Sequence, residues 1–416
     1  MSPVIVMNPM KLCYLDNNAT TRVAPEVVEA MLPFLREDWG NPSSLYFFGN
    51  KLAKPIDEAR DRVATLVGAD PKEVIFTSCG TESNNSAIRS ALRIHPEKRH
   101  IITSAVEHSA VLNVCQDLEK QGYRVTYLPV DNQGRLDPAE LQGALQPDTA
   151  LVTLMLANNE TGVLFPLAEL ASICHHHSVL IHTDAVQVPG KLPLNAAQMG
   201  IDFLSLSAHK LHAPKGIGLL YARRKAPFHP FLLGGHQERG RRGGTENVAG
   251  MVAFGCAAEL ALSRLSEENS RVRALRDRLE STILNTLPGT QLNGATEPRL
   301  PNTTNIRFDG IESEALLLMF DQLGICASSG SACTTGSLEP SHVLSAMGLT
   351  PAAARSSIRF SLSIDNTEDD VDYVLQHLPG LVQKLRAFSP ARPPSESRPR
   401  FEEKPATINL PAAHPR

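Results

Sequence analysis

The sequence predicts an α/β fold built around a mostly parallel sheet. Short apolar runs alternate with helical patterns through the middle of the chain, which is the rhythm of strand–helix–strand units. Several of these runs are apolar at nearly every residue, as strands buried on both faces are. Seven strands are therefore expected, at residues 74–77, 100–103, 124–129, 150–156, 179–183, 203–207 and 218–221.

The segments between these strands carry helical periodicity. The clearest helical patterns lie at residues 83–94, 109–121 and 167–175. Ligands of parallel α/β sheets bind beyond the carboxyl ends of the strands. The polar residues that directly follow the predicted strands are therefore the first candidates for a functional site.

A second region begins near residue 263. Its first part, residues 267–287, has the pattern of one long amphipathic helix rich in Arg and Glu. Short strands and further helices follow, which predicts a smaller α+β unit. The strands are expected at residues 305–308 and 357–361, and the helices at residues 312–323 and 367–387.

Length and composition predict two domains and a tail, since 416 residues are too many for one ordinary core. We expect a large domain over residues 12–262 and a small domain over residues 263–389, with the first residues of the chain packing beside the small domain. Residues 390–416 are rich in Pro and charge and poor in apolar side chains, so a disordered tail is predicted there.

The charge and cysteine content exclude several classes of function. The net charge is -4, with 42% hydrophobic and 20% charged residues, so no nucleic-acid or membrane partner is expected. The N-terminus lacks the pattern of a signal peptide, which predicts a cytoplasmic protein. The seven cysteines are odd in number and include no C-x-x-C pair, so neither a disulfide framework nor a structural zinc site is expected.

Lys210 is the first candidate for a chemical role. It follows the strand predicted at residues 203–207 and lies beside His209. A lysine that is removed from water loses pKa and becomes an amine nucleophile able to form a Schiff base. The alternative, a solvated surface lysine, stays open from this residue alone.

Asp184 follows another apolar strand, at residues 179–183. Its carboxylate could pair with the protonated ring nitrogen of a pyridine cofactor and keep that ring an electron sink. Gln187, three residues further on, could donate to the ring oxygen of the same cofactor. The alternative for Asp184 is an ordinary N-cap at the start of a helix.

Residues 77–85 lie between a predicted strand and a predicted helix and are mostly small and polar. Backbone N–H groups at such a helix N-terminus bind phosphate. The side chains of Thr81, Ser207 and His209 could complete a phosphate cup, although an ordinary capped helix would show the same pattern.

Two further polar residues follow predicted strands. His108 could stack on a cofactor ring and move protons, and Asn159 could contact the ring oxygen or a substrate. A structural role remains the alternative for His108. The histidine run at residues 175–177 has no acidic partner in the sequence nearby and is interpreted as a polar helix end rather than a metal site.

With these residues in place, the chain resembles class-V aminotransferase-fold enzymes, and within them the cysteine desulfurases of the NifS type. The resemblance extends over residues 12–388. Three stretches favour the NifS type in particular: FTSCGTES, GGHQERGRRGGTEN and SSGSACTTGSLEPSHV. Eight segments carry the family resemblance in chain order, at residues 14–21, 40–44, 77–85, 157–162, 182–187, 207–218, 243–247 and 328–333.

The resemblance implies fold-type I, with a seven-stranded sheet in the large domain, and pyridoxal 5'-phosphate as the cofactor. It implies that Lys210 binds the cofactor covalently, that Asp184 and Gln187 contact its ring, and that His108 stacks on it. The residues expected around the phosphate and its approach are Gly80, Thr81, Ser207, Ala208 and His209.

The resemblance also implies how substrate and subunits meet. Asn159 and Arg359 are expected to hold the carboxylate of L-cysteine, although Arg359 could equally be a surface arginine on a strand. Thr245 is expected to reach the cofactor phosphate of a second subunit, so a homodimer follows.

The reaction implied is the conversion of L-cysteine to L-alanine, with the sulfur passing to Cys333 as a persulfide. An iron–sulfur scaffold protein, in particular one serving nitrogenase, would accept that sulfur, and Cys333 could then share an iron–sulfur ligand role through the persulfide. Cys333 lies in a run of small polar residues, which predicts an exposed loop, whereas Cys326 lies in an apolar run and is predicted to be a core cysteine.

Other functions stay open at this point. A selenocysteine lyase, an aminotransferase or a cysteine sulfinate desulfinase would share the fold, and a non-catalytic sulfur carrier or scaffold could retain it. A transaminase needs no loop cysteine, so Cys333 favours a desulfurase. Lys210, Asp184 and His108 argue against the non-catalytic alternative.

Overall fold

The computed structural model describes residues 11–329 and 339–388. Its main feature is a seven-stranded sheet in the order β2-β8-β7-β6-β5-β3-β4, which confirms the predicted fold class. Every strand runs parallel to its neighbours except β8, which is antiparallel to both β7 and β2. The strands are β2 (Val74–Thr77), β3 (His100–Ser104), β4 (Arg124–Leu128), β5 (Thr149–Thr153), β6 (Leu180–Asp184), β7 (Phe203–Ser207) and β8 (Gly218–Ala222).

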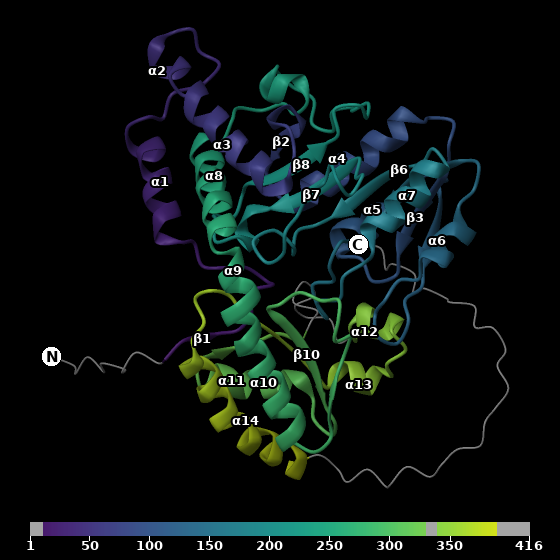
Figure 1. The fold of residues 1–416 in the computed structure, drawn as a ribbon, viewed down its shortest axis with the longest axis vertical. Coiled ribbons are helices and arrows are strands. Elements are labelled where there is room, and N and C mark those ends of the chain that lie inside the picture. The colour runs from purple at the N-terminus through teal and green to yellow at the C-terminus, as the bar shows by residue number, and fades with distance from the viewer. Residues whose placement is uncertain (1–10, 330–338, 389–416) are drawn as a thin grey trace.

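Helices cover both faces of this sheet (Figure 1). Successive side chains of a strand point to opposite faces. Ile75 accordingly packs in one apolar cluster, with α4 and α5, while Phe76 packs in the other, with α3 and α8. The helices are α1 (Pro25–Arg36), α2 (Phe47–Asn50), α3 (Ala53–Val67), α4 (Gly80–Ile94), α5 (Ser109–Lys120), α6 (Pro138–Ala144), α7 (Leu167–His176) and α8 (Val248–Ser263).

Helices α3 and α8 lie in close contact because of a glycine. A Cβ atom at Gly255 would lie 2.7 Å from the Cα of Ala59, so a larger residue there would push the two helices apart. This contact holds α8, which leads into the second region of the chain, against α3.

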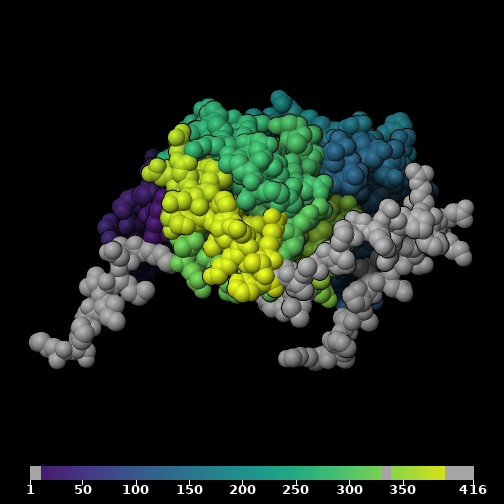
Figure 2. Space-filling view, turned by 90° about the horizontal axis from the view of Figure 1, so that it is seen from below, coloured from purple at the N-terminus to yellow at the C-terminus, as the bar shows by residue number. Residues whose placement is uncertain are grey.

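A smaller sheet, in the order β12-β10-β9, lies with α10 (Arg273–Thr286), α11 and α14 around a separate apolar cluster. Figure 2 shows α14, in yellow, beside the green segment that includes α10. The elements are β9 (Thr290–Leu292), β10 (Thr303–Phe308), α11 (Ser313–Asp321), α12 (His342–Ala346), α13 (Pro351–Arg355), β12 (Ser357–Ser361) and α14 (Glu368–Phe388).

The N-terminal segment joins this smaller cluster. Strand β1 (Cys13–Tyr14) pairs in parallel with β11 (Ile325–Cys326), and Cys13 and Leu15 are fully buried in the same apolar cluster as α10 and α14. The predicted domain boundary near residue 262 stays a prediction.

Two expected elements differ from the structure. The helix predicted at 267–287 is instead α9 (Leu265–Glu267), a π-helical turn η4 (Glu268–Val272) and α10 (Arg273–Thr286). The strand predicted to reach residue 156 ends at residue 153, although Leu154, Met155 and Leu156 stay buried after they leave the sheet. Burial, not strand geometry, explains the apolar run.

Two side-chain predictions were wrong. Cys326 is only partly buried, because β11 is a two-residue strand with a single neighbour; Cys13, Cys115 and Cys174 are the fully buried thiols. His175 does have an acidic partner, since its Nε2 lies 3.3 Å from Oδ2 of the buried Asp202, which is distant in sequence.

The described residues contain no group of His, Cys, Asp or Glu side chains able to hold a metal ion. Within residues 11–329 and 339–388, no single helix is long and apolar enough to cross a membrane; one bent helix pair, α8 with residues 265–286, passes by length and composition only.

Candidate active site

The predicted site residues gather at one edge of the large sheet. Strands β2, β3, β5, β6 and β7 run in the same direction, so their carboxyl ends lie along this edge. The residues that follow these ends include Gly80, His108, Asn159, Asp184 and Lys210. The direction of the strands therefore places these candidate residues along one edge of the sheet, and their roles stay predictions.

Lys210 ends the short 3-10 turn that follows β7 and is partly buried. Its Nζ donates to the backbone oxygens of Asn18, at 2.5 Å, and Ala19, at 2.7 Å. The lysine is therefore held against the N-terminal segment, and the alternative of a freely solvated surface lysine is wrong.

Asp184 is the last residue of β6 and is 8% exposed. Its Oδ2 accepts a hydrogen bond from Nδ2 of Asn84 at 2.7 Å, and its Oδ1 accepts one from the backbone N–H of Val186 at 3.0 Å. Turns follow rather than a helix, so the N-cap alternative is wrong. Two donors hold this carboxylate in one orientation at the sheet edge.

Gln187 lies on the same turn and is buried. Its Nε2 donates to the backbone oxygen of Asn18 at 3.0 Å, which is the oxygen that Lys210 also contacts. Gln187 and Lys210 therefore meet at the carbonyl of Asn18, and Asp184 lies three residues before Gln187 at the end of β6.

The N-terminus of α4 supplies the predicted anion site. Gly80 is the first residue of this 15-residue helix, and a Cβ there would lie 3.0 Å from Cγ2 of Val186 and 3.4 Å from Cβ of Ser207. The helix N-terminus thus lies directly against β7, while Thr81 is exposed beside it. The first N–H groups of the helix are available to an anion at this point.

His209 lies two residues after Ser207, which is the residue that lies against the N-terminus of α4. Its Nδ1 is 3.1 Å from Oγ1 of Thr20, and its backbone oxygen accepts from the N–H of Thr21 at 3.0 Å. Burial, with a smaller effect of Lys210 and Lys215, lowers the pKa of the imidazole to about 4. The ring is therefore neutral at physiological pH. Ala208, fully buried, completes the turn.

His108 is the N-cap of α5 and is partly exposed. Its Nδ1 accepts the backbone N–H of Ala110 at 3.2 Å, which assigns the proton of the neutral ring to Nε2. The neighbouring Glu107 is fully buried, and burial raises its pKa to about 8. His108 thus presents a defined tautomer.

Arg359 is 2% exposed on β12, so the alternative of a surface arginine is wrong. Its Nη1 donates to the backbone oxygen of Asn159 at 3.0 Å, and its Nη2 to Oδ1 of Asp16 at 2.5 Å. The guanidinium therefore lies beside Asn159, as the sequence-based expectation requires of two residues that share a ligand.

Thr245 is exposed and precedes α8. Its loop is tied to the α4 terminus by an ion pair in which Nε of Arg242 lies 2.9 Å from Oε1 of Glu82. A second, buried pair links Arg60 to Glu238 through two 2.8 Å hydrogen bonds. The loop is anchored, while Thr245 faces away from the core.

Cys333 lies outside the described residues. The described chain leading to it passes the site, because Ser328 and Arg359 exchange two backbone hydrogen bonds, of 3.1 and 2.6 Å. The chain after it returns at Ser341, whose Oγ is 2.6 Å from Oε2 of the buried Glu160.

Sequence reasoning missed three residues that complete the site. Asn18 contributes the carbonyl shared by Lys210 and Gln187, Asp16 pairs with Arg359, and Asn84 holds Asp184. The segments 14–21 and 77–85, which contain them, were already among those carrying the family resemblance, but no role had been assigned to Asp16, Asn18 or Asn84.

The arrangement fits a phosphorylated ring cofactor with a reactive carbonyl carbon. An amine, a carboxylate, an amide donor and a helix N-terminus lie along the same edge of the sheet, and these are the groups that would meet the carbonyl carbon, ring nitrogen, ring oxygen and phosphate. The close approach of Gly80 to Ser207 shapes the anion end, and the fixed Asp184 carboxylate lies at the carboxyl end of the neighbouring strand β6.

Comparison with known proteins gives a consistent result. Residues 13–374 match the family model for class-V aminotransferases. The chain is 58% identical over 381 residues to "Cysteine desulfurase 2" of Trichormus variabilis, covering 92% of this chain and 96% of that one. It is 53% identical over 378 residues to "Cysteine desulfurase NifS" of Azotobacter vinelandii, covering 91% and 94%. A solved structure titled as a NifS-like protein superposes with a TM-score of 0.85 at 39% identity, covering 90% of this chain and 100% of that one.

Proposed function

This chain belongs to the class-V aminotransferase family, and on that premise we propose that it is a NifS-type cysteine desulfurase. It converts L-cysteine to L-alanine and passes the sulfur on for iron–sulfur cluster assembly, including the clusters of nitrogenase. The observation that carries the proposal is that Lys210 and Gln187 contact the same backbone oxygen, that of Asn18, at the sheet edge where Asp184 ends β6.

The cofactor is pyridoxal 5'-phosphate, which supplies an electron sink when bound. Lys210 would hold it covalently, Asp184 would face its ring nitrogen and Gln187 its ring oxygen. His108 would stack on the ring. The phosphate would lie at the N-terminus of α4, among Gly80, Thr81, Ser207, Ala208 and His209.

Side chains of this chain bind the substrate and carry out its proton transfer and sulfur transfer. Arg359 and Asn159 orient the carboxylate of L-cysteine, with the planar guanidinium suited to two oxygens. The amine of Lys210 would remove the α-proton of the substrate, and His108, with its proton on Nε2, would take part in proton transfer. The thiolate of Cys333 takes the substrate sulfur, so that L-cysteine and a thiol become L-alanine and a persulfide. An iron–sulfur scaffold protein is the proposed acceptor of that sulfur.

Replacing Asp184 by Ala is expected to lower turnover by several orders of magnitude. Without the carboxylate the ring nitrogen loses the partner that keeps it protonated, and an unprotonated ring is a poor electron sink. The cofactor should still bind through the α4 terminus. Alanine production at saturating cofactor measures the effect, and unchanged turnover would show that Asp184 only orders the turn after β6.

A homodimer is part of the proposal, because Thr245 is expected to reach the cofactor phosphate of the second subunit. Large apolar side chains are exposed at and before α2, which projects from the body in Figure 1: Leu45 is 98% and Phe47 82% exposed. Patches of this kind mark contacts between proteins. They support an interface at this end of the molecule.

Light scattering on the purified protein should therefore give the mass of two chains. Leu45→Asp together with Phe47→Asp should weaken the dimer and lower cofactor occupancy, because each site would lose Thr245 of the other chain. Leu318→Asp is the matched control: it changes a leucine that is 69% exposed on α11 and should leave the dimer intact. A fully active monomer would contradict this part of the proposal.

Incubation with L-cysteine and a thiol reductant tests the function as a whole. Sulfide and alanine should appear in equal amounts. A transaminase would consume cysteine without releasing sulfide, a selenocysteine lyase would act on selenocysteine but not on cysteine, and a carrier or scaffold would form neither product. Any of these three results would replace the proposal.

A further inference from the structure

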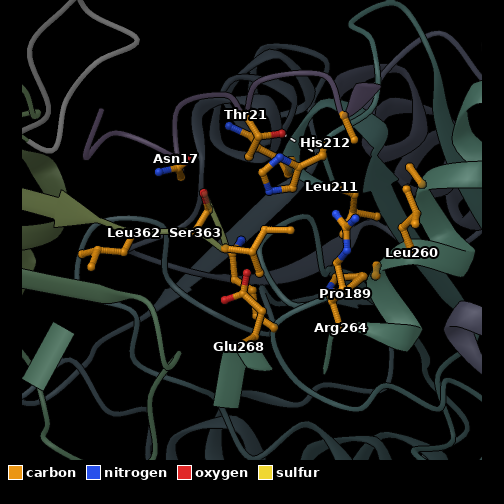
Figure 3. A pocket seen from close by; sticks show the side chains of 17 residues that line it. Asn17, Thr21, Pro189, Leu211, His212, Leu260, Arg264, Glu268, Leu362 and Ser363 are labelled. Carbon is orange, nitrogen blue, oxygen red and sulfur yellow. Dashed lines mark hydrogen bonds between the residues drawn. The ribbon is translucent and has the colours of Figure 1, made fainter. Parts of the chain in front are cut away.

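Lys191 is a buried lysine that contacts Gln187 and that the proposed mechanism does not use. Lys191 is 5% exposed and lines the pocket drawn in Figure 3, which Lys210 also lines. Its Nζ donates to the backbone oxygen of Gln187 at 3.0 Å and to the side-chain Oε1 of Gln187 at 3.3 Å. Both contacts are to the residue that faces the proposed ring oxygen.

These contacts determine how the amide of Gln187 is turned. An ammonium group has three donors and no acceptor, so only the oxygen of the amide can face it. The NH₂ group must then face the other way, and Nε2 does donate to the backbone oxygen of Asn18, the acceptor shared with Lys210. Without the ammonium group, a buried amide could turn over and present its oxygen to the site instead.

The pocket also contains a group that keeps Lys191 charged. Glu268, on the π-helical turn η4, is 6% exposed and lines the same pocket as His212 and Arg264 (Figure 3). Burial lowers the pKa of Lys191 to about 8, and the negative charge of Glu268 opposes that shift. Burial likewise raises the pKa of Glu268 to about 7, against the effect of Lys191. Each charge therefore favours the other.

The backbone of Lys191 is fixed from the same side. Nδ2 of Asn269, also on η4, donates to the backbone oxygen of Lys191 at 2.7 Å. The chain of contacts thus runs from η4 through Lys191 to Gln187 and ends at the carbonyl that Lys210 contacts.

We propose that Lys191 is a positioning residue for the desulfurase reaction: its ammonium group fixes the Gln187 amide with Nε2 toward the cofactor's ring oxygen. The proposal rests on the function proposed above. It adds that the η4 turn, which does not touch the cofactor, influences the ring oxygen indirectly, because it holds Lys191 and Lys191 holds Gln187.

The test is the pH midpoint of the visible absorbance of the bound cofactor, which reports on the ring oxygen and its neighbouring nitrogen. Loss of the Nε2 donor should raise this midpoint by about half a unit to one unit, the effect of one hydrogen bond. Gln187→Leu and Lys191→Met should each raise it. The double variant should shift no further than Gln187→Leu alone, because Lys191 acts only through Gln187.

Arg264→Met is the matched control. Arg264 lines the same pocket, but its Nη2 bonds Oε1 of Glu26 and it has no contact to Gln187 among the described hydrogen bonds, so the midpoint should not move. Lys191→Gln guards against a failure of Lys191→Met to fold. Its amide can both donate and accept, so it should raise the midpoint by less than the methionine does.

Three outcomes would overturn the proposal in distinguishable ways. A midpoint unchanged in folded Lys191→Met or Lys191→Gln, with Gln187→Leu shifted, would remove Lys191 alone. A further shift on adding Lys191→Met to Gln187→Leu would show that the lysine acts by its charge and not through the amide. No shift in Gln187→Leu would remove the role of Gln187 in the proposed function, and that of Lys191 with it.

Discussion

Lys210→Ala is expected to lose both the visible absorbance of the cofactor and all turnover of L-cysteine. The amine of Lys210 has two roles in the proposal, since it binds the cofactor covalently and then removes the α-proton of the substrate. It lies at the carboxyl end of β7, held by the carbonyls of Asn18 and Ala19. No loss of fold is expected, because the side chain is only partly buried.

Two further variants sharpen this experiment. Lys210→Arg should fail equally, because a guanidinium keeps the positive charge but is not a usable nucleophile. Lys215→Ala, an exposed lysine in the same loop, should keep both absorbance and turnover. Normal activity in Lys210→Ala would refute the cofactor assignment. It would also refute the proposal that the active site lies at this edge of the sheet.

Cys333→Ala is expected to separate cofactor chemistry from sulfur transfer. The groups proposed to hold the cofactor do not include Cys333, so the variant should keep its visible absorbance. Lys210 should still exchange the α-hydrogen of L-cysteine for deuterium in heavy water. Sulfide release should fall to background, and an alkylating reagent should trap no persulfide.

Cys326→Ala is the control for that variant. Cys326 is partly buried on β11 beside β1, so its loss should change stability by about 0.5–3 kcal/mol and leave desulfuration intact. If Cys333→Ala kept wild-type desulfuration, or Cys326→Ala alone lost it, the nucleophile would be another residue and the transaminase and lyase alternatives would reopen.

The strands of the large sheet could be predicted closely because all except the edge strand β4 are almost entirely buried. Such strands are apolar throughout and end where polar residues begin, as at Thr77 before the α4 terminus and at Ser207 before Lys210. The same boundary placed the candidate site, since a parallel sheet brings those ends to one edge. For this reason Asp184, Gln187 and Lys210 could be grouped before their contacts were known.

The remaining contacts could not be predicted because they join residues far apart in the chain. The hydrogen bond from Lys210 to residue 18 spans 192 positions, and that from Arg359 to Asp16 spans 343. No local pattern records such a pairing. The π-helical turn at Glu268 was missed for a related reason: its amphipathic pattern matches an α-helix, and tertiary contacts from Asn269 and Arg271 accompany the local change.

The role of Lys191 illustrates the same limit. In sequence it is a lysine after a Pro-Gly turn, a setting typical of a solvated charge. In the structure it is almost fully buried and bonded to Gln187, four positions earlier. The packing of η4, of α8 and of residues 362–364 around this pocket removes it from water.

A single-turnover reaction without reductant tests the central claim most directly. The cofactor-loaded dimer is mixed with one equivalent of L-cysteine per chain, alanine is measured, and the protein is alkylated, digested and weighed by mass spectrometry. The account predicts alanine and a persulfide on Cys333 in equal amounts, with the other six cysteines unmodified by sulfur. Alanine without added sulfur on Cys333, or sulfur on a different cysteine, would contradict it.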